Sequence, residues 1–343
     1  MRFCDFPFKY FYLDYFDGRA MLCPWMRNPQ GCIGNIFEKS VDELWTNDQA
    51  TMLRESILNN SFEHCRIEGC PFLQNDNLPD VDDSERTIET QLKPYPTHIN
   101  LAYDFVCNQY CETCRPDKFR PPKNYHVLMR AIRDRIAPYL NTAKSISTSG
   151  HGDPFASAYM MDILSNIHPV DPELCILLET NGVYFDEAHW ARIEHLKSVD
   201  LRVIVTINSF HEWTYNHISR GGDYKKLMHN LMFLRSLRKD GYIKHFTNTL
   251  VIQDRNFREI PEFIDRSFEE LECDQVILRP CYQWGTMPAD VFWFKDVLNP
   301  CHPYHAEYLE IMAHPQLQDK RVFNFAGGTL HPATRFPSAD AGA

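Results

Sequence analysis

The 343-residue sequence has no uninterrupted apolar run that approaches the roughly 18 residues needed to span a membrane, which argues against an integral membrane protein. It also lacks the basic, apolar and small-residue succession of a signal peptide, because its first residues, MRFCDFPFKYFYLDYF, are aromatic and carry acids early. Positive charge is scarce: 35 Lys and Arg stand against 46 Asp and Glu, a formal net charge of −11. Such a surface repels phosphate backbones, which argues against a general nucleic-acid binder.

Cysteine, in contrast, is abundant, with 12 residues. Without a secretion signal we expect the chain in a reducing cytoplasm, where structural disulfides are rare. Cysteines there indicate metal binding, redox chemistry or catalysis, or they are simply buried thiols. One group lies in the first 70 residues, a second falls within one short stretch, and four are scattered: Cys4, Cys23, Cys32, Cys65 and Cys70; Cys107, Cys111 and Cys114; and Cys175, Cys273, Cys281 and Cys301.

The pattern along the chain divides it into four segments. The stretch Gln74–Pro96 is polar and acidic, which indicates a linker or surface connection. Before it, a helix is predicted over Val41–Leu58, with Ser40 as N-cap and Glu43 three residues later. We therefore predict a small cysteine-rich domain (1–73), a linker (74–96), an α/β domain (97–287) and a C-terminal extension (288–343).

In the third segment, strand and helix patterns alternate. Runs such as VIVTI and TLVI are almost continuously apolar and β-branched, as expected for parallel strands buried on both faces. The predicted strands are Ile99–Phe105, Ser145–Ser149, Leu174–Leu178, Leu201–Ile207, Phe246–Ile252 and Gln275–Arg279. The predicted helices are Tyr125–Leu140, Ala156–Ile167, Asp186–Leu196, Tyr224–Lys239 and Phe257–Glu270. This alternation predicts a parallel array, an open sheet or a partial barrel, with its site at the carboxyl ends of the strands.

The first predicted strand is followed directly by CNQYCETC, which places Cys107, Cys111 and Cys114 in one loop with the spacing C-x3-C-x2-C. A structural zinc site is normally closed by four ligands. A [4Fe–4S] cluster held by three cysteines instead leaves one iron open to an exogenous ligand. The spacing therefore favours an iron–sulfur cluster, and zinc with a distant fourth ligand remains the alternative.

CNQYCETC after a first β-strand resembles the cluster motif of the radical S-adenosylmethionine (radical SAM) enzymes, and the resemblance runs across roughly residues 97–285. At the second strand, SISTSGHGDPF is similar to the family's Gly-Gly-Glu-Pro turn, although His151 replaces the first glycine and Asp153 replaces the glutamate. LLETNG is similar to the family's Thr-Asn-Gly turn, VIVTINSF matches the place where polar residues meet the adenosyl ribose, and YNHISRGGDY resembles a segment ending in Arg-Gly-Gly.

The resemblance implies an α/β fold, a partial (β/α)6 TIM-like barrel, with a [4Fe–4S] cluster and S-adenosylmethionine as cofactors. The open iron binds the amino and carboxylate groups of S-adenosylmethionine, reductive cleavage gives a 5′-deoxyadenosyl radical, and this radical abstracts hydrogen from the substrate, while the protein supplies position and excludes water. Arg220 is the candidate for the methionyl carboxylate. The implied cofactor-binding residues are Gly152, Asp153, Pro154, Thr180, Asn181, Thr206, Asn208 and Arg220.

Each of these matches also has an ordinary interpretation. Gly152 and Pro154 could form a simple βα turn. The pair Gly221–Gly222 could end one helix and start the next, and Arg220 could be a surface charge. Their order along the chain, each at the end of the expected strand, favours the family resemblance.

The N-terminal segment contains a hairpin pattern. In FKYFYLDYFDGRAMLC, Asp17 and Gly18 lie between alternating residues, which predicts a tight turn between two strands. Such a hairpin would bring Cys4 and Cys23, at its two ends, close together. Four thiolates in this region could bind a [4Fe–4S] cluster or a structural zinc.

The same segment resembles the auxiliary-cluster (SPASM or twitch) domains of many radical SAM enzymes, which usually follow the barrel and here precede it. The shared features are the hairpin turn before Cys23, Gly34-Asn35-Ile36, the Ser40–Trp45 helix start and the closing Cys65-x4-Cys70 pair. The resemblance implies one auxiliary iron–sulfur cluster on Cys4, Cys23, Cys65 and Cys70, with Cys32 as the alternative to Cys4. Such a cluster would relay electrons and favour net oxidation.

The implied function is that of a radical SAM enzyme acting on a small sugar- or nucleotide-like metabolite, by dehydrogenation, epimerisation or C–C bond chemistry, with a reductant such as flavodoxin or ferredoxin as partner. One alternative is the maturation of a ribosomally made peptide. A second is a zinc-binding interaction protein without catalysis. Cys281, just past the sixth predicted strand, could donate a hydrogen atom to a product radical or simply be packed.

Overall fold

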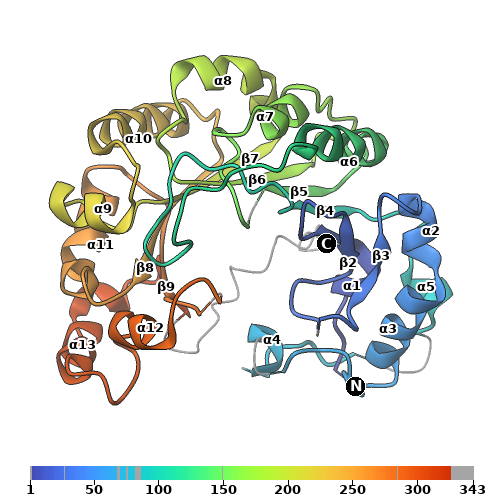
Figure 1. Cartoon of the computed structure of the whole chain (residues 1–343), viewed down its shortest axis with the longest axis horizontal. Helices are drawn as coiled ribbons and strands as arrows, with labels where there is room; N and C mark the ends of the chain where they lie inside the picture. The colour runs from blue at the N-terminus through green and yellow to red at the C-terminus, as the bar shows by residue number, and fades with distance from the viewer. Residues whose placement is uncertain are drawn as a thin grey trace.

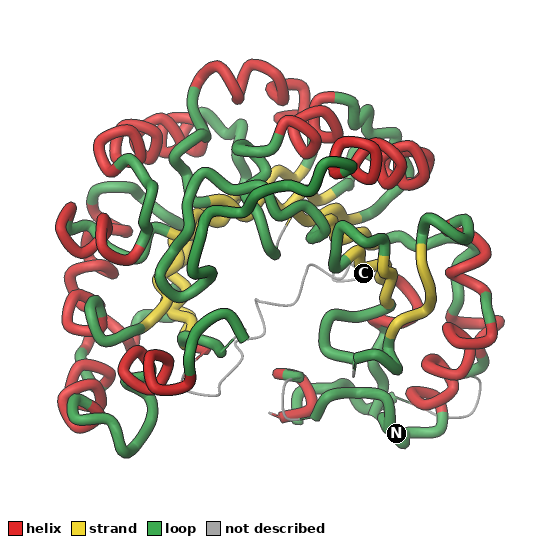
Figure 2. The backbone as a smooth tube through the Cα atoms, in the orientation of Figure 1, coloured by secondary structure: helices red, strands yellow, loops and turns green. Residues whose placement is uncertain are grey.

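The computed structural model describes residues 2–26, 28–67, 70–74, 76–81, 86–148, 150–283 and 285–325. Ser149, at the end of a predicted strand, and residues 326–343 of the predicted C-terminal extension lie outside the described residues. One ten-stranded sheet runs through the described chain in the order β10-β9-β8-β7-β6-β5-β4-β1-β2-β3 (Figure 1). Its strands form an arc, with most of the helices outside it (Figure 2). No helix of the described part combines the length and the hydropathy required to cross a bilayer.

Six parallel strands form the centre of this sheet, as predicted. They are β4 (His98–Leu101), β5 (Ser145–Thr148), β6 (Cys175–Thr180), β7 (Asp200–Thr206), β8 (His245–Ile252) and β9 (Gln275–Pro280), each paired in parallel with the next. β4 is shorter than predicted, because the chain leaves the sheet after Leu101. Beyond that point the chain forms a turn, in which Asp104 Oδ1 accepts the N–H of Val106, two residues further on, at 3.0 Å.

The barrel helices lie on the convex side of the sheet (Figure 1). Two of the predicted helices, α6 (Tyr125–Leu140) and α10 (Tyr224–Lys239), have the predicted bounds. The others are α7 (Ala158–Ser165), α8 (Glu187–Ile193) with η1 (Glu194–Ser198), and η2 (Phe257–Glu259) with α11 (Ile260–Glu269). The short helix α9 (Glu212–Ile218) was not predicted, because its polar sequence has no extended apolar stripe.

The other face of the sheet is concave. Arg279 Nη2 on β9 lies 2.7 Å from Glu179 Oε1 on β6. These strands are three positions apart in the sheet, which would separate them by about 14 Å if it were flat. The two side chains meet only because the sheet curls toward this face, so the six strands form a partial barrel.

The N-terminal region continues the same sheet instead of forming a separate one. β1 (Tyr10–Leu13) pairs in parallel with β4, from Tyr10↔His98 to Leu13↔Leu101. The predicted hairpin is confirmed: β1 is antiparallel to β2 (Arg19–Met21), and β3 (Cys32–Asn35) follows at the edge. Short helix α1 (Phe6–Lys9) precedes it.

The single helix predicted over Val41–Leu58 is two helices, α2 (Val41–Thr46) and α3 (Asp48–Leu58). Ser40 and Glu43 form the predicted capping box on α2. Asn47 ends α2 in an extended conformation, and its side chain caps α3 by accepting the Ala50 N–H at 2.8 Å. An Asn in the middle of a helical pattern competes with the helix in this way.

The remaining elements lie at the end of the predicted cysteine-rich segment, in the predicted linker and in the C-terminal extension. α4 (Pro71–Gln74) and α5 (Ile88–Gln91) are short helices on either side of the undescribed residues 82–85. After β9 come α12 (Ala289–Lys295), α13 (His305–Met312) and η3 (Pro315–Gln318), and β10 (Val322–Asn324) pairs in parallel with β9. The three predicted boundaries between the four segments stay predictions.

Candidate active site

The three closely spaced cysteines lie in a loop at the carboxyl end of β4, here called the cluster loop (residues 105–115). Arg115 closes the loop by donating to Phe105 O at 2.9 Å. Burial raises the pKa values of the Cys107 and Cys111 thiols to about 12, and the charges of neighbouring groups, including another cysteine of the loop in each case, add to this shift. Cys114 is exposed. The loop therefore places Cys111 within electrostatic range of both Cys107 and Cys114.

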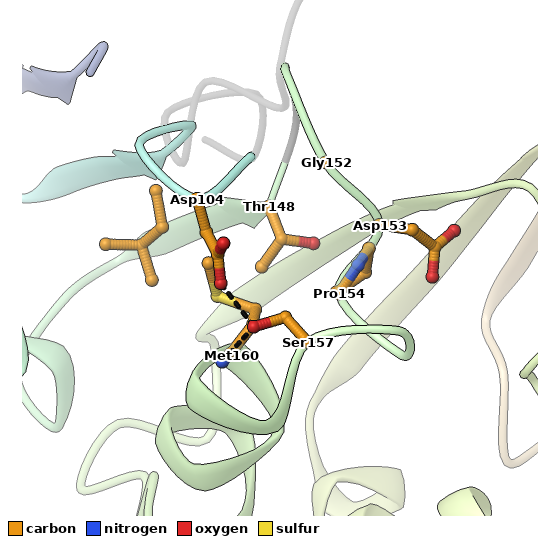
Figure 3. Close-up of a pocket in the computed structure, with 8 residues that line it drawn as sticks. Asp104, Thr148, Gly152, Asp153, Pro154, Ser157 and Met160 are labelled. Carbon is orange, nitrogen blue, oxygen red and sulfur yellow. Dashed lines mark hydrogen bonds between the residues drawn. The ribbon is translucent and has the colours of Figure 1, made fainter. Parts of the chain in front are cut away.

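The turn after β5 packs directly beneath the cluster loop. Asp153 N donates to Val106 O at 2.9 Å. A Cβ on Gly152 would lie 2.4 Å from Asp104 O and 2.6 Å from Val106 O, so only glycine allows this approach. Gly152, Asp153 and Pro154 also line a small cavity beside Asp104 and Thr148 (Figure 3). Any side chain at position 152 would therefore push the turn after β5 away from the cluster loop.

The carboxylate of Asp153 points away from that cavity (Figure 3). Its Oδ2 accepts Thr180 Oγ1 and Asn181 N, both at 2.8 Å, and its Oδ1 accepts two backbone amides of its own turn. Burial raises its pKa, although these hydrogen bonds act in the opposite direction. Asp153 thus joins the turns after β5 and β6, and its contact with a methionyl ammonium stays a prediction.

The turn after β6 reaches the cluster loop itself. Asn181 Nδ2 donates to Asn108 Oδ1 at 2.8 Å and lies 3.7 Å from the Cys107 sulfur. Thr180 Oγ1, which donates to Asp153, also accepts the Gly182 N–H at 3.1 Å. Thr180 thus connects this turn to the turn after β5, and Asn181 connects it to the cluster loop.

Thr206 and Asn208, the two residues predicted to meet the adenosyl ribose, lie at and just after the end of β7. Thr206 lies at the end of β7 on the concave face and is half-buried. Asn208 is buried with a positive φ of 62°, and its Oδ1 accepts Val251 N at 3.0 Å. Its side chain connects β7 to β8, so a contact with the adenosyl ribose stays a prediction for both residues.

Arg220 supports the cluster loop from the side. Its Nε donates to Tyr110 O at 3.1 Å and its Nη2 donates to Arg115 O at 3.0 Å. In return, Tyr110 N donates to the Arg220 carbonyl at 2.9 Å. A Cβ on Gly222 would lie 2.4 Å from the Tyr215 hydroxyl, so this glycine allows close packing. The predicted contact of Arg220 with a methionyl carboxylate is not tested by this geometry.

His151, where the family turn has glycine, connects the turn to the N-terminal region. Its Nε2 lies 3.3 Å from Asp14 Oδ1, and its ring stacks on Phe105 at 4.2 Å. Asp14 Oδ1 also accepts the Tyr12 hydroxyl at 2.6 Å. The sequence pattern singled out this position only as a departure from glycine. The contact with Asp14 could not be predicted, because it depends on the pairing of β1 with β4.

The four N-terminal cysteines named as auxiliary ligands line one cavity. The apolar side chains around them include Met26, Ile57 and Phe62. Cys32, the alternative to Cys4, lies in β3 with its sulfur 3.5 Å from Gly34 O. The cysteines that line the cavity are Cys4, Cys23, Cys65 and Cys70.

Backbone amides point at several of these sulfurs. The Cys23 sulfur accepts Trp25 N at 3.4 Å, and the Cys107 sulfur of the cluster loop accepts Gln109 N at the same distance. Amide donors to sulfur stabilise thiolates and tune iron–sulfur potentials. Across the described ranges, no three His, Cys, Asp or Glu side chains lie close enough to hold one metal ion.

Cys281 lies just after β9 and is buried. Burial raises the pKa of its thiol to about 12, and the nearby Lys295 ammonium acts against this shift. The thiol is therefore protonated at neutral pH. Its role as a hydrogen-atom donor stays a prediction.

Comparison with known proteins gives two family matches. Residues 105–266 match the family model of the radical SAM superfamily, and residues 4–71 match that of SPASM, an iron–sulfur cluster-binding domain. No curated protein matches the chain.

Solved structures show a remote likeness. SuiB from Streptococcus suis, bound to S-adenosylmethionine, shares 11% identity over 80% of this chain and 60% of that chain, with a TM-score of 0.42. A histidine-tagged form of anSMEcpe with bound AdoMet shares 18% sequence identity over 53% of this chain and 50% of that chain, with a TM-score of 0.38. Methylornithine synthase (PylB) shares 12% sequence identity, covers 62% of this chain and 61% of its own, and has a TM-score of 0.40. The chain thus spans 50–61% of these three proteins.

Proposed function

The chain belongs to the radical SAM superfamily and carries an N-terminal SPASM domain, and from this premise we propose that it cleaves S-adenosylmethionine at a [4Fe–4S] cluster held by Cys107, Cys111 and Cys114. In this proposal the 5′-deoxyadenosyl radical abstracts hydrogen from a small sugar- or nucleotide-like metabolite. An auxiliary cluster on the four N-terminal cysteines relays electrons.

One observation carries the proposal: three turns from successive strands converge on the cluster loop. The turn after β5 binds it through Asp153 N, the turn after β6 through Asn181 Nδ2, and the segment after β7 through Arg220. Three thiols with no fourth cysteine in the loop suit a cluster that keeps one iron open. The missing side chain of Gly152 lets the turn after β5 pack against the backbone carbonyls of Asp104 and Val106, which holds the start of the cluster loop in place.

When bound, the cluster supplies one electron to the sulfonium of S-adenosylmethionine. The chain's own residues hold the loop and exclude water. Arg220 fixes the loop backbone at Tyr110 and Arg115, and Asn181 sits beside the Cys107 sulfur. In the proposal, Gly152 and Pro154 present the turn backbone to the methionyl group, and Thr206 faces the concave side where a substrate would lie.

The concave face supports a small polar substrate. Asn100 Nδ2 on β4 donates to the Tyr10 hydroxyl on β1 at 2.9 Å, and Ser147 lies on the same face of β5. The Glu179–Arg279 ion pair completes this surface on β6 and β9. Hydroxyl, amide and charged groups of this kind bind polyhydroxylated metabolites through directional hydrogen bonds.

The test is anaerobic purification, with iron, sulfide and zinc counted per chain, followed by dithionite and S-adenosylmethionine. We expect about eight irons, as for two cubanes, and formation of 5′-deoxyadenosine. The triple variant Cys107→Ala, Cys111→Ala, Cys114→Ala should lose about half of the iron and all cleavage. The triple variant Cys175→Ala, Cys273→Ala, Cys301→Ala is the matched control and should keep both.

Full iron in the first triple variant would contradict the assignment. Zinc at both sites without cleavage would favour the zinc-binding interaction protein instead. For the substrate class, the metabolite and peptide fractions of a cell extract are compared as stimulants of 5′-deoxyadenosine formation. Stimulation by the peptide fraction alone would favour peptide maturation.

A further inference from the structure

A charged network joins the cluster loop to the C-terminal part of the chain. Lys295 Nζ lies 2.8 Å from Glu112 Oε1 and 3.1 Å from Asp254 Oδ1. Glu112 lies between Cys111 and Cys114 in the sequence, and Lys295 is the last residue of α12. Neither family model reaches α12, so this contact adds a residue to the site from outside the matched domains.

Lys295 is the buried member of this network. Its side chain is 5% exposed, whereas the carboxylates of Glu112 and Asp254 are 23% and 25% exposed. A buried ammonium is tolerated only when charged partners and hydrogen bonds compensate its lost hydration. Without it, the two carboxylates would face each other and repel, so the position of Glu112 depends on Lys295.

Two further contacts keep Glu112 in this position. Its backbone N–H donates to Ile218 O at 2.8 Å, and its Oε2 lies 3.4 Å from Arg255 Nε. Asp254 N in turn donates to the Lys295 carbonyl at 3.2 Å. The contacts come from the segment after β7, the segment after β8 and α12, so the part of the cluster loop between two ligands is held from three directions.

We propose that Lys295 is a positioning residue of the catalytic cluster: it holds the Cys111–Cys114 segment in place through Glu112, and its positive charge raises the reduction potential of the cluster. The inference rests on the proposed function, because it assumes that these cysteines ligate the cluster. Net charge and burial around an iron–sulfur cluster are established determinants of its potential. The C-terminal extension is then part of the cluster site.

The test compares Lys295→Met with Lys295→Arg in the full-length, anaerobically reconstituted protein. We expect Lys295→Met to lose part of the catalytic cluster, up to about half of the total iron, while the auxiliary cluster remains. In the fraction that still loads, EPR-monitored redox titration should show a more negative midpoint potential. Lys295→Arg keeps the charge and should stay near wild type in both measurements. Lys197→Met, which removes an exposed lysine paired with Glu194, is the matched control and should change neither.

A double variant covers the case in which Lys295→Met does not fold. Glu112→Gln combined with Lys295→Met removes one charge of each sign, and we expect it to bind more iron than Lys295→Met alone. Wild-type iron content and potential in Lys295→Met would overturn the inference, and so would a double variant that binds no more iron than the single one. A wild-type protein without a cluster would instead refute the proposed function itself.

Discussion

Gly152 shows how much one hydrogen atom can matter at this site. A methyl group there would meet two backbone carbonyls of the cluster-loop segment, which cannot rotate away as a flexible side chain can. We expect Gly152→Ala to displace the loop and reduce formation of 5′-deoxyadenosine by roughly 100-fold, since displacing a reacting group by about 1 Å costs a factor of this order. The measurement is the initial rate with dithionite and S-adenosylmethionine.

Gly241→Ala is the control for that substitution. Gly241 has a positive φ of 75° and nothing within 4 Å of its Cβ position, so alanine there adds strain of about 1 kcal/mol without touching the site. It should lower the unfolding temperature slightly and leave cleavage unchanged. Equal activity of the Gly152→Ala variant and wild type would show that cleavage does not depend on the close packing of this turn against the cluster loop.

Asp14 gives a pH prediction at the same scale. Burial alone would raise its pKa, but hydrogen bonds from His151 and Tyr12 and the nearby Arg19 outweigh it, and its pKa is lowered. A carboxylate with a lowered pKa stabilises the folded state above its unfolded pKa of 3.8, and this contribution is lost as pH falls through the folded value. The wild type should therefore exceed Asp14→Asn in stability by about 1 kcal/mol at pH 7.

That difference should shrink below about pH 4, where the unfolded state begins to take up the proton, and it should be lost as the pH falls through the lower pKa of the folded state. Thermal unfolding of both proteins across the acid range provides the measurement. A stability difference that does not change with pH would mean that the carboxylate is not the group responsible.

The sequence named candidate site residues but not the contacts that they make. The three clustered cysteines, Asn181 and Arg220 were all named from the pattern and lie together in the structure. Their hydrogen-bond partners could not be predicted. Arg220, for example, donates to backbone carbonyls of an irregular loop that is distant in sequence. Lys295 lay in a stretch with no recognisable pattern, so no sequence signal pointed to it.

At the scale of elements, regular patterns were predicted well and exceptions to them poorly. The α6 and α10 helices have long amphipathic sequences, and both have the predicted bounds. The break at Asn47 was missed because an apolar pattern runs through it, while the side chain caps the second helix. β4 was predicted too long because the apolar run continues into the cluster loop.

Arg54 on α3 connects three helices of the N-terminal region. It is fully buried, donates to Pro7 O at 2.9 Å and to Trp45 O at 2.7 Å, and its guanidinium lies 4.4 Å from the centre of the Trp45 ring. We expect Arg54→Ala to destabilise this region by about 3 kcal/mol, since it creates a cavity and leaves two carbonyls without donors.

Thermal unfolding and the iron content of the auxiliary site measure that effect. Arg133→Ala is the control, because Arg133 pairs with Asp134 and Asp162 at the exposed surface and its loss should cost less than about 1 kcal/mol. Similar unfolding temperatures for the two variants would mean that Arg54 does not hold the three helices together.

At the scale of the whole molecule, the N-terminal region and the barrel share one hydrogen-bonded sheet. Removing residues 1–96 would strip β1 from β4 and expose the backbone edge of a parallel strand. Exposed edges pair with other chains. We therefore expect a fragment of residues 97–343 to aggregate when expressed alone, and to become soluble on co-expression with residues 1–96.

Size-exclusion chromatography and sedimentation distinguish these outcomes. A monodisperse barrel fragment would show that the β1–β4 pairing is dispensable for its stability. The pairing could not be predicted from the sequence, because each strand pattern is compatible with many neighbours and only the three-dimensional fold selects one.

The parallel pairing of β1 with β4 also has a consequence for biosynthesis. During translation, the first 70 residues, with the four cysteines of the N-terminal cavity, leave the ribosome before β4 and the cluster loop do. If these cysteines hold the proposed auxiliary cluster, the nascent chain can therefore begin to load it before the strand that will join it to the barrel has emerged. The order of the two domains along the chain thereby sets the order in which they can mature.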